Sequence, residues 1–275
     1  MISVVTGAVS GIGLNTCIQL AARGHQVFAG ALDPEAPALR EAAASAENLH
    51  VVPLDVTDAD SVRAAIATVH DRFGRVDVLI NNAAVGWIGT LEELSVEELQ
   101  SALDVNFFGA IRATKAVLPR MREAGSGRLI AVSSLGGVLG QPFQEAYCAS
   151  KFALEGTYES LRPVAAQFGV HVSLVEPGPV RTSFRRGSRG FDRNADGSAV
   201  DAYQALRAQH EALMVAGEAR EQPPEEVAAC IVKVVEDPNP KLRYQTSSFT
   251  TKLAALKLLD LDGEAVSAFT TSWFE

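Results

Sequence analysis

Short runs of β-branched and aliphatic residues recur along the chain, and each is followed by a turn and then by apolar residues at helical spacing. The predicted strands are Ile2–Thr6, Val27–Ala29, Leu49–Pro53, Val76–Ile80, Arg128–Ser133 and Val170–Val175, with a further candidate at Leu242–Thr246. The helical patterns between them cover Leu14–Arg23, Pro34–Ala46, a segment from Ala59, Val96–Glu123 (one long or two successive helices) and Ala146–Phe168. In the first helix, Leu14, Ile18 and Leu20 are expected to face the core. Strands that alternate with helices of this length pair in parallel through right-handed crossovers. We therefore predict one α/β domain over residues 1–275, built on a single doubly wound parallel sheet with helices on both faces.

The alternation weakens after Thr182. Residues 184–199 contain several arginines and glycines without periodicity, and a loop of this length in a compact domain is usually a lid or disordered. Helical patterns return at Val200–Ala216, Pro224–Glu236 and Lys252–Leu259. We therefore expect a substrate lid over about residues 183–222 and a C-terminal extension over about residues 242–275.

Charge and composition exclude several classes of function. The chain carries 24 Lys and Arg against 33 Asp and Glu, a net charge of −9, and such an acidic protein is a poor binder of nucleic acid or anionic membranes. No apolar stretch approaches the roughly 20 residues that a membrane helix requires, and the start at Met1 reads as a buried strand rather than a secretory signal. The three cysteines and five histidines show no metal-ligand spacing. We therefore expect no metal site, no nucleic-acid partner, no membrane span and a cytoplasmic location.

A glycine-rich turn, Thr6-Gly7-Ala8-Val9-Ser10-Gly11-Ile12-Gly13, joins the first predicted strand to the first predicted helix. Glycines at such a turn let the backbone approach a pyrophosphate, and the helix N-terminus offers unpaired N–H groups to it. Glycines that merely form a tight turn are the alternative interpretation. The position of this turn at the start of an alternating α/β pattern favours a nucleotide site, although its first two glycines are separated by three residues rather than one.

A second group of residues carries acid–base chemistry. Tyr147 and Lys151 are four residues apart and share one face of a predicted helix. A nearby ammonium lowers the pKa of a phenol, so Tyr147 could exchange a proton with an alcohol or carbonyl. Such pairs are also common on solvated helices, but Ser133 and Ser134 end a predicted strand, where a parallel sheet faces its ligand crevice. Asn106 lies among apolar neighbours and is either part of this site or a satisfied helix kink.

These motifs resemble the short-chain dehydrogenase/reductase family. The match runs in order through the Thr6–Gly13 turn, Asp55, Asn81-Asn82-Ala83, Asn106, Ser134, Tyr147-x-x-x-Lys151, Pro177-Gly178 and Thr182. The interval of 13 residues to Tyr147 favours Ser134 over Ser133, because the family's catalytic serine usually has that spacing. From Asn106 to Phe184 the sequence is similar to the branch of 17β-hydroxysteroid and retinol dehydrogenases. The stretches that carry this likeness are Gly125–Arg128, Tyr147–Gly156 and Pro177–Val180. Two later stretches, Pro224–Val227 and Leu242–Tyr244, extend it nearly to the C-terminus.

The resemblance implies a Rossmann-like fold, a homodimer or homotetramer, and a role for each matching residue. Tyr147 would be the proton donor or acceptor, and Lys151 would lower its pKa and hold the nicotinamide ribose. Ser134 would orient the substrate oxygen, and Asn106 would hold a water that links Lys151 to solvent. Asp55 and Val56 would lie against adenine, Asn82 against the adenosine ribose, and Thr182 over the carboxamide or phosphates. The other implied cofactor contacts are Thr6, Gly7, Ser10, Gly11, Ile12, Gly13, Ala83, Pro177, Gly178 and Val180.

The end of the second strand bears on the choice of cofactor. An acid there selects NAD through the ribose 2′-OH, whereas NADP prefers a basic neighbour. The family's acid position is Ala31 here, the next residue is Leu32, and Asp33 lies one further on. Because that carboxylate is missing and Ser10 could bind a 2′-phosphate, we expect NADP(H) to be favoured over NAD(H).

Taken together, these residues predict an NADP(H)-dependent oxidoreductase that interconverts a secondary alcohol and a ketone or aldehyde. The resemblance suggests a bulky apolar substrate of the steroid, retinoid or polyketide kind. The alternative is a non-catalytic dinucleotide-binding sensor or interaction module on the same fold, which would not need a proton donor. Four aromatic residues lie near the expected cleft: Phe143 and Phe184 would suit an apolar substrate, Trp87 touches it or fills the core, and His210 lines the pocket or is structural.

Overall fold

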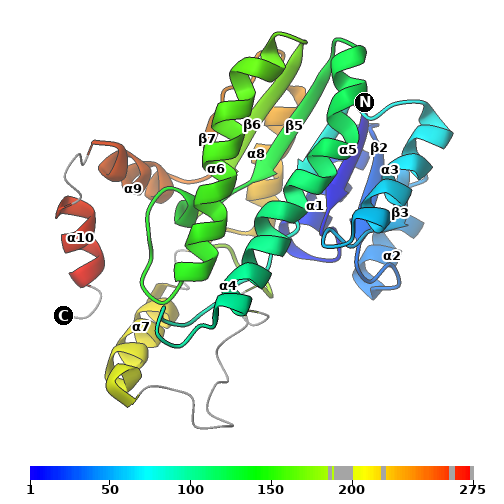
Figure 1. Ribbon diagram of the computed structural model, residues 1–275. Coiled ribbons are helices and arrows are strands. Elements are labelled where there is room, and N and C mark those ends of the chain that lie inside the picture. The colour runs from blue at the N-terminus through cyan, green and yellow to red at the C-terminus, as the bar shows by residue number, and fades with distance from the viewer. Residues whose placement is uncertain (185–187, 189–200, 218–220, 260–263, 273–275) are drawn as a thin grey trace.

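Seven parallel strands form the centre of the computed structural model, which describes residues 1–184, 188, 201–217, 221–259 and 264–272 (Figure 1). The strand order is β3-β2-β1-β4-β5-β6-β7, so the chain starts in the middle of the sheet and winds outward in both directions. The strands are β1 (Ile2–Thr6), β2 (Gln26–Ala31), β3 (Leu49–Pro53), β4 (Val78–Asn81), β5 (Gly127–Val132), β6 (Val170–Glu176) and β7 (Arg243–Gln245). The predicted doubly wound, Rossmann-like sheet is confirmed.

Helices cover both faces of this sheet. The described helices are α1 (Gly11–Ala22), α2 (Pro37–Ala44), α3 (Ala59–Phe73), α4 (Val96–Leu103), α5 (Gly109–Glu123), α6 (Glu145–Ala166), α7 (Gln204–Gly217), α8 (Pro224–Glu236), α9 (Ser248–Leu259) and α10 (Glu264–Thr271). Side chains of α3, α5 and α6 pack on one face of the sheet, and those of α1, α2 and α8 pack on the other. In Figure 1, α5 and α6 lie in front of the sheet and α8 behind it.

The central strands are mostly apolar, as expected for a parallel sheet with both faces buried. Successive residues of a strand point to opposite faces, so Val4 belongs to the core under α3, α5 and α6 while Val5 belongs to the core under α1 and α8. Both side chains are 0% exposed. The carboxyl ends of the strands consequently meet at one edge of a rigid sheet, where the loops can carry a site.

The long helical pattern over residues 96–123 forms two helices. Ser95 and Glu98 make a capping box that starts α4, and a π-helical turn, Asp104–Phe108, joins α4 to α5. A π turn rotates the side chains that follow and often occurs at functional sites. Here it places Asn106 inward, at 1% exposure.

Some expectations from the sequence were wrong or incomplete. Ile18 is 42% exposed, whereas Leu14 and Leu20 are buried as expected. The buried face of α1 is centred on Gly13, Cys17 and Leu20, and Ile18, although four residues from Leu14, lies beyond the edge of that stripe. The short helix α10 was not predicted at all. Among the described helices, none has the length and apolar character needed to cross a membrane.

Candidate active site

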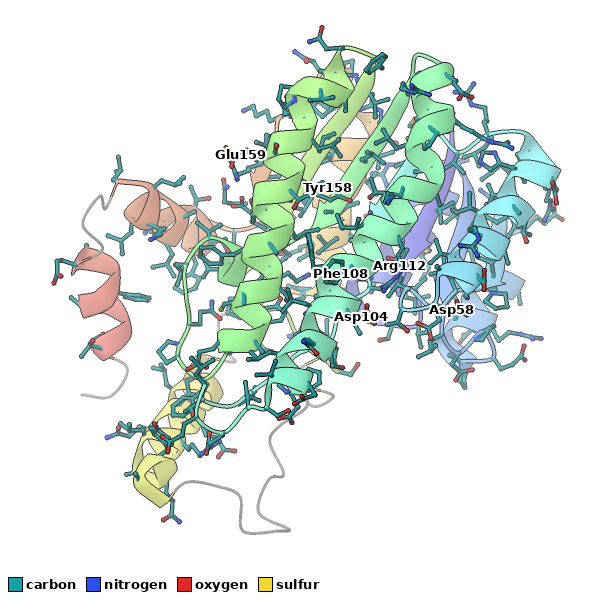
Figure 2. All side chains as sticks on the ribbon, in the orientation of Figure 1. Asp58, Asp104, Phe108, Arg112, Tyr158 and Glu159 are labelled. Atoms are coloured by element: carbon teal, nitrogen blue, oxygen red, sulfur yellow. The ribbon has the colours of Figure 1, made fainter. Side chains whose placement is uncertain are left out.

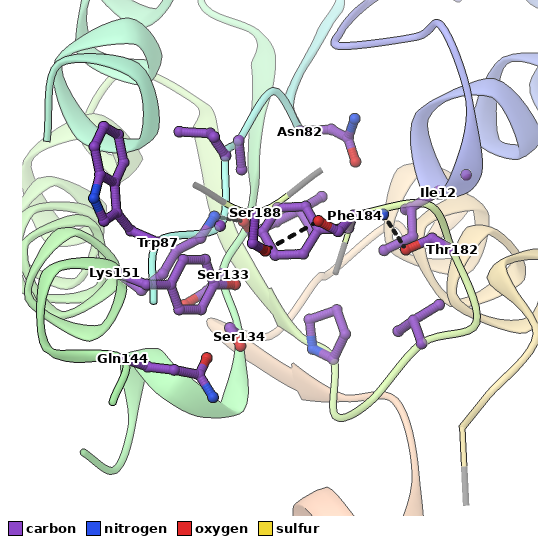
Figure 3. Close-up of a pocket in the computed structure, with 18 of the residues that line it drawn as sticks. Ile12, Asn82, Trp87, Ser133, Ser134, Gln144, Lys151, Thr182, Phe184 and Ser188 are labelled. Carbon is purple, nitrogen blue, oxygen red and sulfur yellow. Dashed lines mark hydrogen bonds between the residues drawn. The ribbon is translucent and has the colours of Figure 1, made fainter. Parts of the chain in front are cut away.

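A cavity of about 820 Å³ lies along the carboxyl ends of the central strands, and its lining includes most of the residues singled out from the sequence. These are Gly7, Ser10, Gly11, Ile12, Asp55, Val56, Asn82, Ala83, Ser134, Tyr147, Lys151, Pro177, Gly178, Val180 and Thr182. Figure 3 shows Lys151, Ser133 and Ser134 at one side of the cavity, Ile12 and Thr182 at the other, and Phe184 between them. The fold thus brings together segments that are far apart in the sequence.

The glycine turn forms a cradle in which side chains have no room. Gly7 and Gly11 have φ angles of +67° and +57°, which favour glycine, and a Cβ on Gly7 would lie 2.7 Å from the Cα of Ala83. The side chain of Ser10, the residue before α1, does not cap the helix, so it accepts no hydrogen bond from the first N–H groups of α1. Bare backbone and helix N–H groups at one place fit the pyrophosphate of a dinucleotide.

Thr6 and Gly13, which the sequence placed among the cofactor contacts, do not line the cavity. The Thr6 hydroxyl accepts hydrogen bonds from the backbone N–H groups of Asn82 and Ala83, each at 3.0 Å. A Cβ on Gly13 would lie 2.4 Å from the carbonyl oxygen of Gly7. Both residues therefore shape the cradle by holding β1, β4 and α1 together, because their positions face protein rather than the cavity.

The far end of the cavity, beyond the glycine turn, is lined by Asp55 and Val56. The Asp55 carboxylate accepts hydrogen bonds from the backbone N–H and the hydroxyl of Thr57, at 2.8 and 2.7 Å. Ala31 is fully buried at the end of β2, and Leu32 lines the cavity with 75% of its surface exposed. The position at which an acid would select NAD thus carries a methyl group.

Ser134, Tyr147 and Lys151 come together at the end of β5. Ser134 begins a short 3-10 turn, Leu135–Gly137, and its hydroxyl accepts a hydrogen bond from the backbone N–H of Gly136 at 3.1 Å. The Ser134 hydroxyl is near enough to the Tyr147 phenol to lower its pKa. The Lys151 ammonium donates to the carbonyl oxygen of Val132 at 2.9 Å and lies 5.8 Å from the centre of the Tyr147 ring. The sequence predicted that Ser134, Tyr147 and Lys151 would lie together. They do so because Tyr147 and Lys151 are one helical turn apart on α6 and Ser134 lies at the end of β5.

The electrostatics of the group differ from the expectation. Burial raises the pKa of Tyr147 to about 12, and the nearby hydroxyl of Ser134 only partly opposes that rise. Burial also lowers the pKa of Lys151 to about 8, against the attraction of Glu155. The predicted lowering of the Tyr147 pKa by Lys151 is therefore not found, because removal from water outweighs other influences on the phenol. At neutral pH Tyr147 keeps its proton and can donate it.

Asn106 does not line the cavity. Its side-chain oxygen accepts from the backbone N–H of Val85 at 2.8 Å, and its amide donates to the carbonyl oxygen of Val85 at 2.9 Å and to Ser150 at 3.0 Å. These contacts satisfy the amide inside a helix irregularity, and the implied role of Asn106, to hold a water that links Lys151 to solvent, stays a prediction. The amide ties the loop at Val85, which lines the cavity, to the residue before Lys151.

Several cavity residues could not be identified from sequence motifs. Trp87 both lines the cavity and packs into a small core cluster, and His210 lines the cavity with its ring 5.2 Å from that of Phe143. Phe143 itself lies outside the lining, whereas Phe184 is part of it. Lining residues that the motifs did not indicate include Leu139, Gln141, Gln144, Glu211, Glu221, Phe249, Leu253 and Phe269. Their positions depend on tertiary packing, and no local spacing marks them.

Part of the predicted lid, including the arginine-rich stretch after Phe184, lies outside the described residues, at 185–187, 189–200 and 218–220. Within the predicted range, α7 supplies His210 and Glu211 to the cavity wall. From the predicted C-terminal extension, α9 supplies Phe249 and Leu253, and α10 supplies Phe269. In the described residues, no group of three or more His, Cys, Asp or Glu is placed to hold a metal ion.

Comparisons with known proteins identify the family to which this chain belongs. The family described as short chain dehydrogenase matches residues 1–192. Human 17-beta-hydroxysteroid dehydrogenase type 1 is 39% identical over 94% of this chain and 81% of that protein. Bovine retinol dehydrogenase 8 is 40% identical over 94% of this chain and 85% of that protein.

Solved structures show the same architecture. A short-chain dehydrogenase from Streptomyces avermitilis has a TM-score of 0.83 and 33% identity, covering 99% of this chain and 95% of that one. An alcohol dehydrogenase from Thermococcus sibiricus was solved with 5-hydroxy-NADP (TM-score 0.71, 25% identity, 89% of this chain and 94% of that one). A protein of the same fold from Burkholderia phymatum was solved with NAD (TM-score 0.81, 24% identity, 96% of this chain and 94% of that one). Family match and fold agree, and this chain belongs to the short-chain dehydrogenase family, whose members are oxidoreductases that use nicotinamide dinucleotides.

Proposed function

We propose that this protein is an NADP(H)-dependent oxidoreductase that interconverts an alcohol and its carbonyl form, a ketone from a secondary alcohol or an aldehyde from a primary one, on a bulky apolar molecule. The observation that carries the proposal is the convergence of Ser134, Tyr147 and Lys151 in a largely apolar cavity that also contains the glycine cradle. A proton donor beside a dinucleotide site is the combination that carbonyl reduction requires.

Each of these residues has a definite task in that reaction. When bound, the nicotinamide supplies the hydride. Ser134 would orient the substrate oxygen toward the Tyr147 hydroxyl, which lies near it in the same cavity. Tyr147 would donate its proton to that oxygen in reduction, and its raised pKa keeps the proton in place until the oxygen becomes basic. Lys151 would hold the nicotinamide ribose and stabilise the phenolate that Tyr147 leaves behind.

The preference for NADP(H) is supported by the end of β2. Ala31 presents no carboxylate to repel a 2′-phosphate, and Ser10, which lines the cavity beside the glycine cradle, offers a hydroxyl to it. Proteins of this fold have been solved with either dinucleotide, so the fold leaves the choice to such local side chains.

An apolar substrate is supported by the cavity wall. Hydrophobic side chains from five separate segments line it: Trp87, Leu139, Phe184, Phe249, Leu253 and Phe269. Burial of apolar area at about 25 cal/mol per Å² favours a large hydrophobic molecule over a small polar one. The two curated relatives named above are a hydroxysteroid dehydrogenase and a retinol dehydrogenase, which agrees with this inference.

A homodimer or homotetramer is part of the proposal. Apolar side chains on and next to α6 and at the start of α5 expose between 41% and 60% of their surface, which is costly for a monomer. They are Phe108, Phe152, Val164 and Phe168.

The lid, the C-terminal extension and the cytoplasmic location remain predictions from the sequence.

Turnover of purified protein tests the proposal. Steroid, retinoid and aliphatic ketones are offered with NADPH or NADH, and oxidation of the nicotinamide is followed by its absorbance. We expect reduction of at least one bulky apolar ketone, faster with NADPH. Bound NADPH without turnover across the panel would instead favour the alternative of a non-catalytic dinucleotide sensor.

A further inference from the structure

A cluster of buried charges lies next to Lys151 but outside the cavity lining. Glu155 follows Lys151 by four residues on α6, so both side chains lie on the same face of that helix. Glu155 is 5% exposed, and Glu176, the last residue of β6, is 0% exposed. Two carboxyl groups buried this deeply need a compensating charge or a proton.

Arg243 of β7 supplies that charge. Its Nε lies 3.0 Å from Oε2 of Glu155 and 3.2 Å from Oε1 of Glu176. Its Nη2 donates to Glu159 at 2.9 Å, and Glu159 is exposed on the outer side of α6 (Figure 2). Gln245 donates to the other oxygen of Glu176 at 2.7 Å. One guanidinium thus bridges three carboxylates, two of them buried.

Glu155 and Lys151 also pack against one backbone position. A Cβ on Gly137 would lie 3.1 Å from Cγ of Glu155, 3.2 Å from Cβ of Lys151 and 2.5 Å from the hydroxyl of Ser133. The stems of the two charged side chains therefore run side by side along the turn that follows Ser134. A change in the charge of Glu155 acts on Lys151 through protein rather than through water, where it would be screened.

Glu155 stabilises the charged form of Lys151. Attraction to Glu155 opposes the lowering of the Lys151 pKa, which burial brings to about 8. Burial raises the pKa of Glu155 to about 7, Glu176 raises it further, and Arg243 lowers it. Burial likewise raises the pKa of Glu176. Charged or polar groups from four elements lie around Glu155: Lys151 and Glu159 on α6, Ser133 after β5, Glu176 on β6 and Arg243 on β7.

A purely structural role, the attachment of β7 to α6, is the competing explanation. A buried ion cluster is seldom more stabilising than well-packed apolar residues of the same volume, so stability alone gives little reason for two buried acids here. A structural role also makes no prediction about the charge of Lys151. The pH dependence of the site separates the two explanations.

We propose that Glu155 is a positioning residue whose carboxylate, held by Arg243, keeps the ammonium of Lys151 charged at neutral and mildly basic pH. The inference rests on the proposed function, because it assigns Glu155 a task in supporting the group that assists Tyr147. Carbonyl reduction needs a charged Lys151, so its rate falls as the pH rises through the pKa of that ammonium.

Glu155→Gln tests this inference, because glutamine has the shape of the protonated acid without its charge. We expect the basic limb of the pH profile of kcat to move about one unit toward lower pH, a roughly tenfold lower rate well above both pKa values. Near pH 6, where Glu155 itself is protonated, the variant and the wild type have similar rates. Glu155→Asp, which retains a carboxylate, recovers most of the shift.

Binding of NADPH at each pH, followed by its fluorescence without any ketone, provides a second measurement. The pH at which binding weakens moves in the same direction, because Lys151 would hold the nicotinamide ribose. If the wild type binds NADPH but reduces no carbonyl, the proposed function fails and this binding profile alone decides the role of Glu155.

Glu159→Gln is the matched control, since Glu159 contacts the same guanidinium but is exposed and remote from the cavity. An unmoved profile in Glu155→Gln, or an equal shift in Glu159→Gln, overturns the proposal. If Glu155→Gln does not fold, Arg243→Gln takes its place. It removes the cation that keeps Glu155 charged, so it must shift the profile the same way or the proposal is wrong.

Discussion

Two tyrosines on the same helix allow the catalytic proposal to be separated from a general effect on the fold. Tyr147 and Tyr158 are both buried on α6, about three helical turns apart, and the hydroxyl of Tyr158 is hydrogen-bonded. Only Tyr147 lines the cavity. Replacing each by phenylalanine removes one oxygen atom and little else, so the two variants differ in where the hydroxyl was.

The expected magnitudes follow from the surroundings of each hydroxyl. Loss of a positioned proton donor lowers turnover by about 10²- to 10⁴-fold, equivalent to roughly 3–5 kcal/mol of barrier. Tyr158 lies 2.7 Å from the amide of Asn81 and 2.7 Å from the hydroxyl of Thr114, so its loss removes two buried hydrogen bonds. That loss costs about 1–3 kcal/mol of stability and lowers Tm by several degrees.

We therefore expect Tyr147→Phe to lose nearly all turnover while it still binds NADPH and melts close to the wild type. Tyr158→Phe should melt earlier and retain most of its turnover. Steady-state reduction of the best ketone, NADPH fluorescence titration and thermal unfolding by circular dichroism measure the three quantities. Tyr147→Phe with more than a tenth of wild-type turnover, or equal losses of turnover in both variants, would refute the assignment of the proton donor.

Four further changes test other parts of the site and assembly. Gly13→Ala should weaken NADPH binding at least tenfold, because its Cβ would lie 2.4 Å from a carbonyl oxygen of the glycine turn. Gly156→Ala is the control, since a Cβ there meets nothing within 4 Å, and it should leave NADPH binding unchanged. Equal titration curves for the two variants would contradict this expectation. Ala31→Asp should lower kcat/KM with NADPH and shift the NADPH-to-NADH ratio at least tenfold toward NADH; an unchanged ratio would show that selectivity lies elsewhere. Ser134→Ala should reduce kcat by about 10- to 100-fold with little change in NADPH affinity, and wild-type turnover of a ketone would remove it from the site. Phe152→Glu places a charge on the exposed apolar surface of α6 and should give a smaller particle by light scattering; a monomeric wild type would contradict the proposed oligomer.

The arrangement of elements was predictable because it depends on local pattern. Continuous apolar strands followed by helices of ten or more residues lead to a parallel sheet, and this holds for each strand that was predicted. Local spacing also placed Tyr147 and Lys151 together, since four residues are about one helical turn. It was insufficient for Ile18, whose exposure depends on which neighbours cover α1.

What the sequence by itself determined is therefore the fold, the glycine cradle and the pairing of a phenol with an ammonium on one helix. Tertiary structure alone decided the chemistry of that pair, because burial raises the pKa of Tyr147 and lowers that of Lys151. It also brought Arg243, 88 residues from Glu155, against that carboxylate. Turns of a helix and the pleat of a strand repeat over a few residues, so sequence spacing reveals them. Removal from water and contact between distant segments depend on how the elements pack, and no local spacing encodes that.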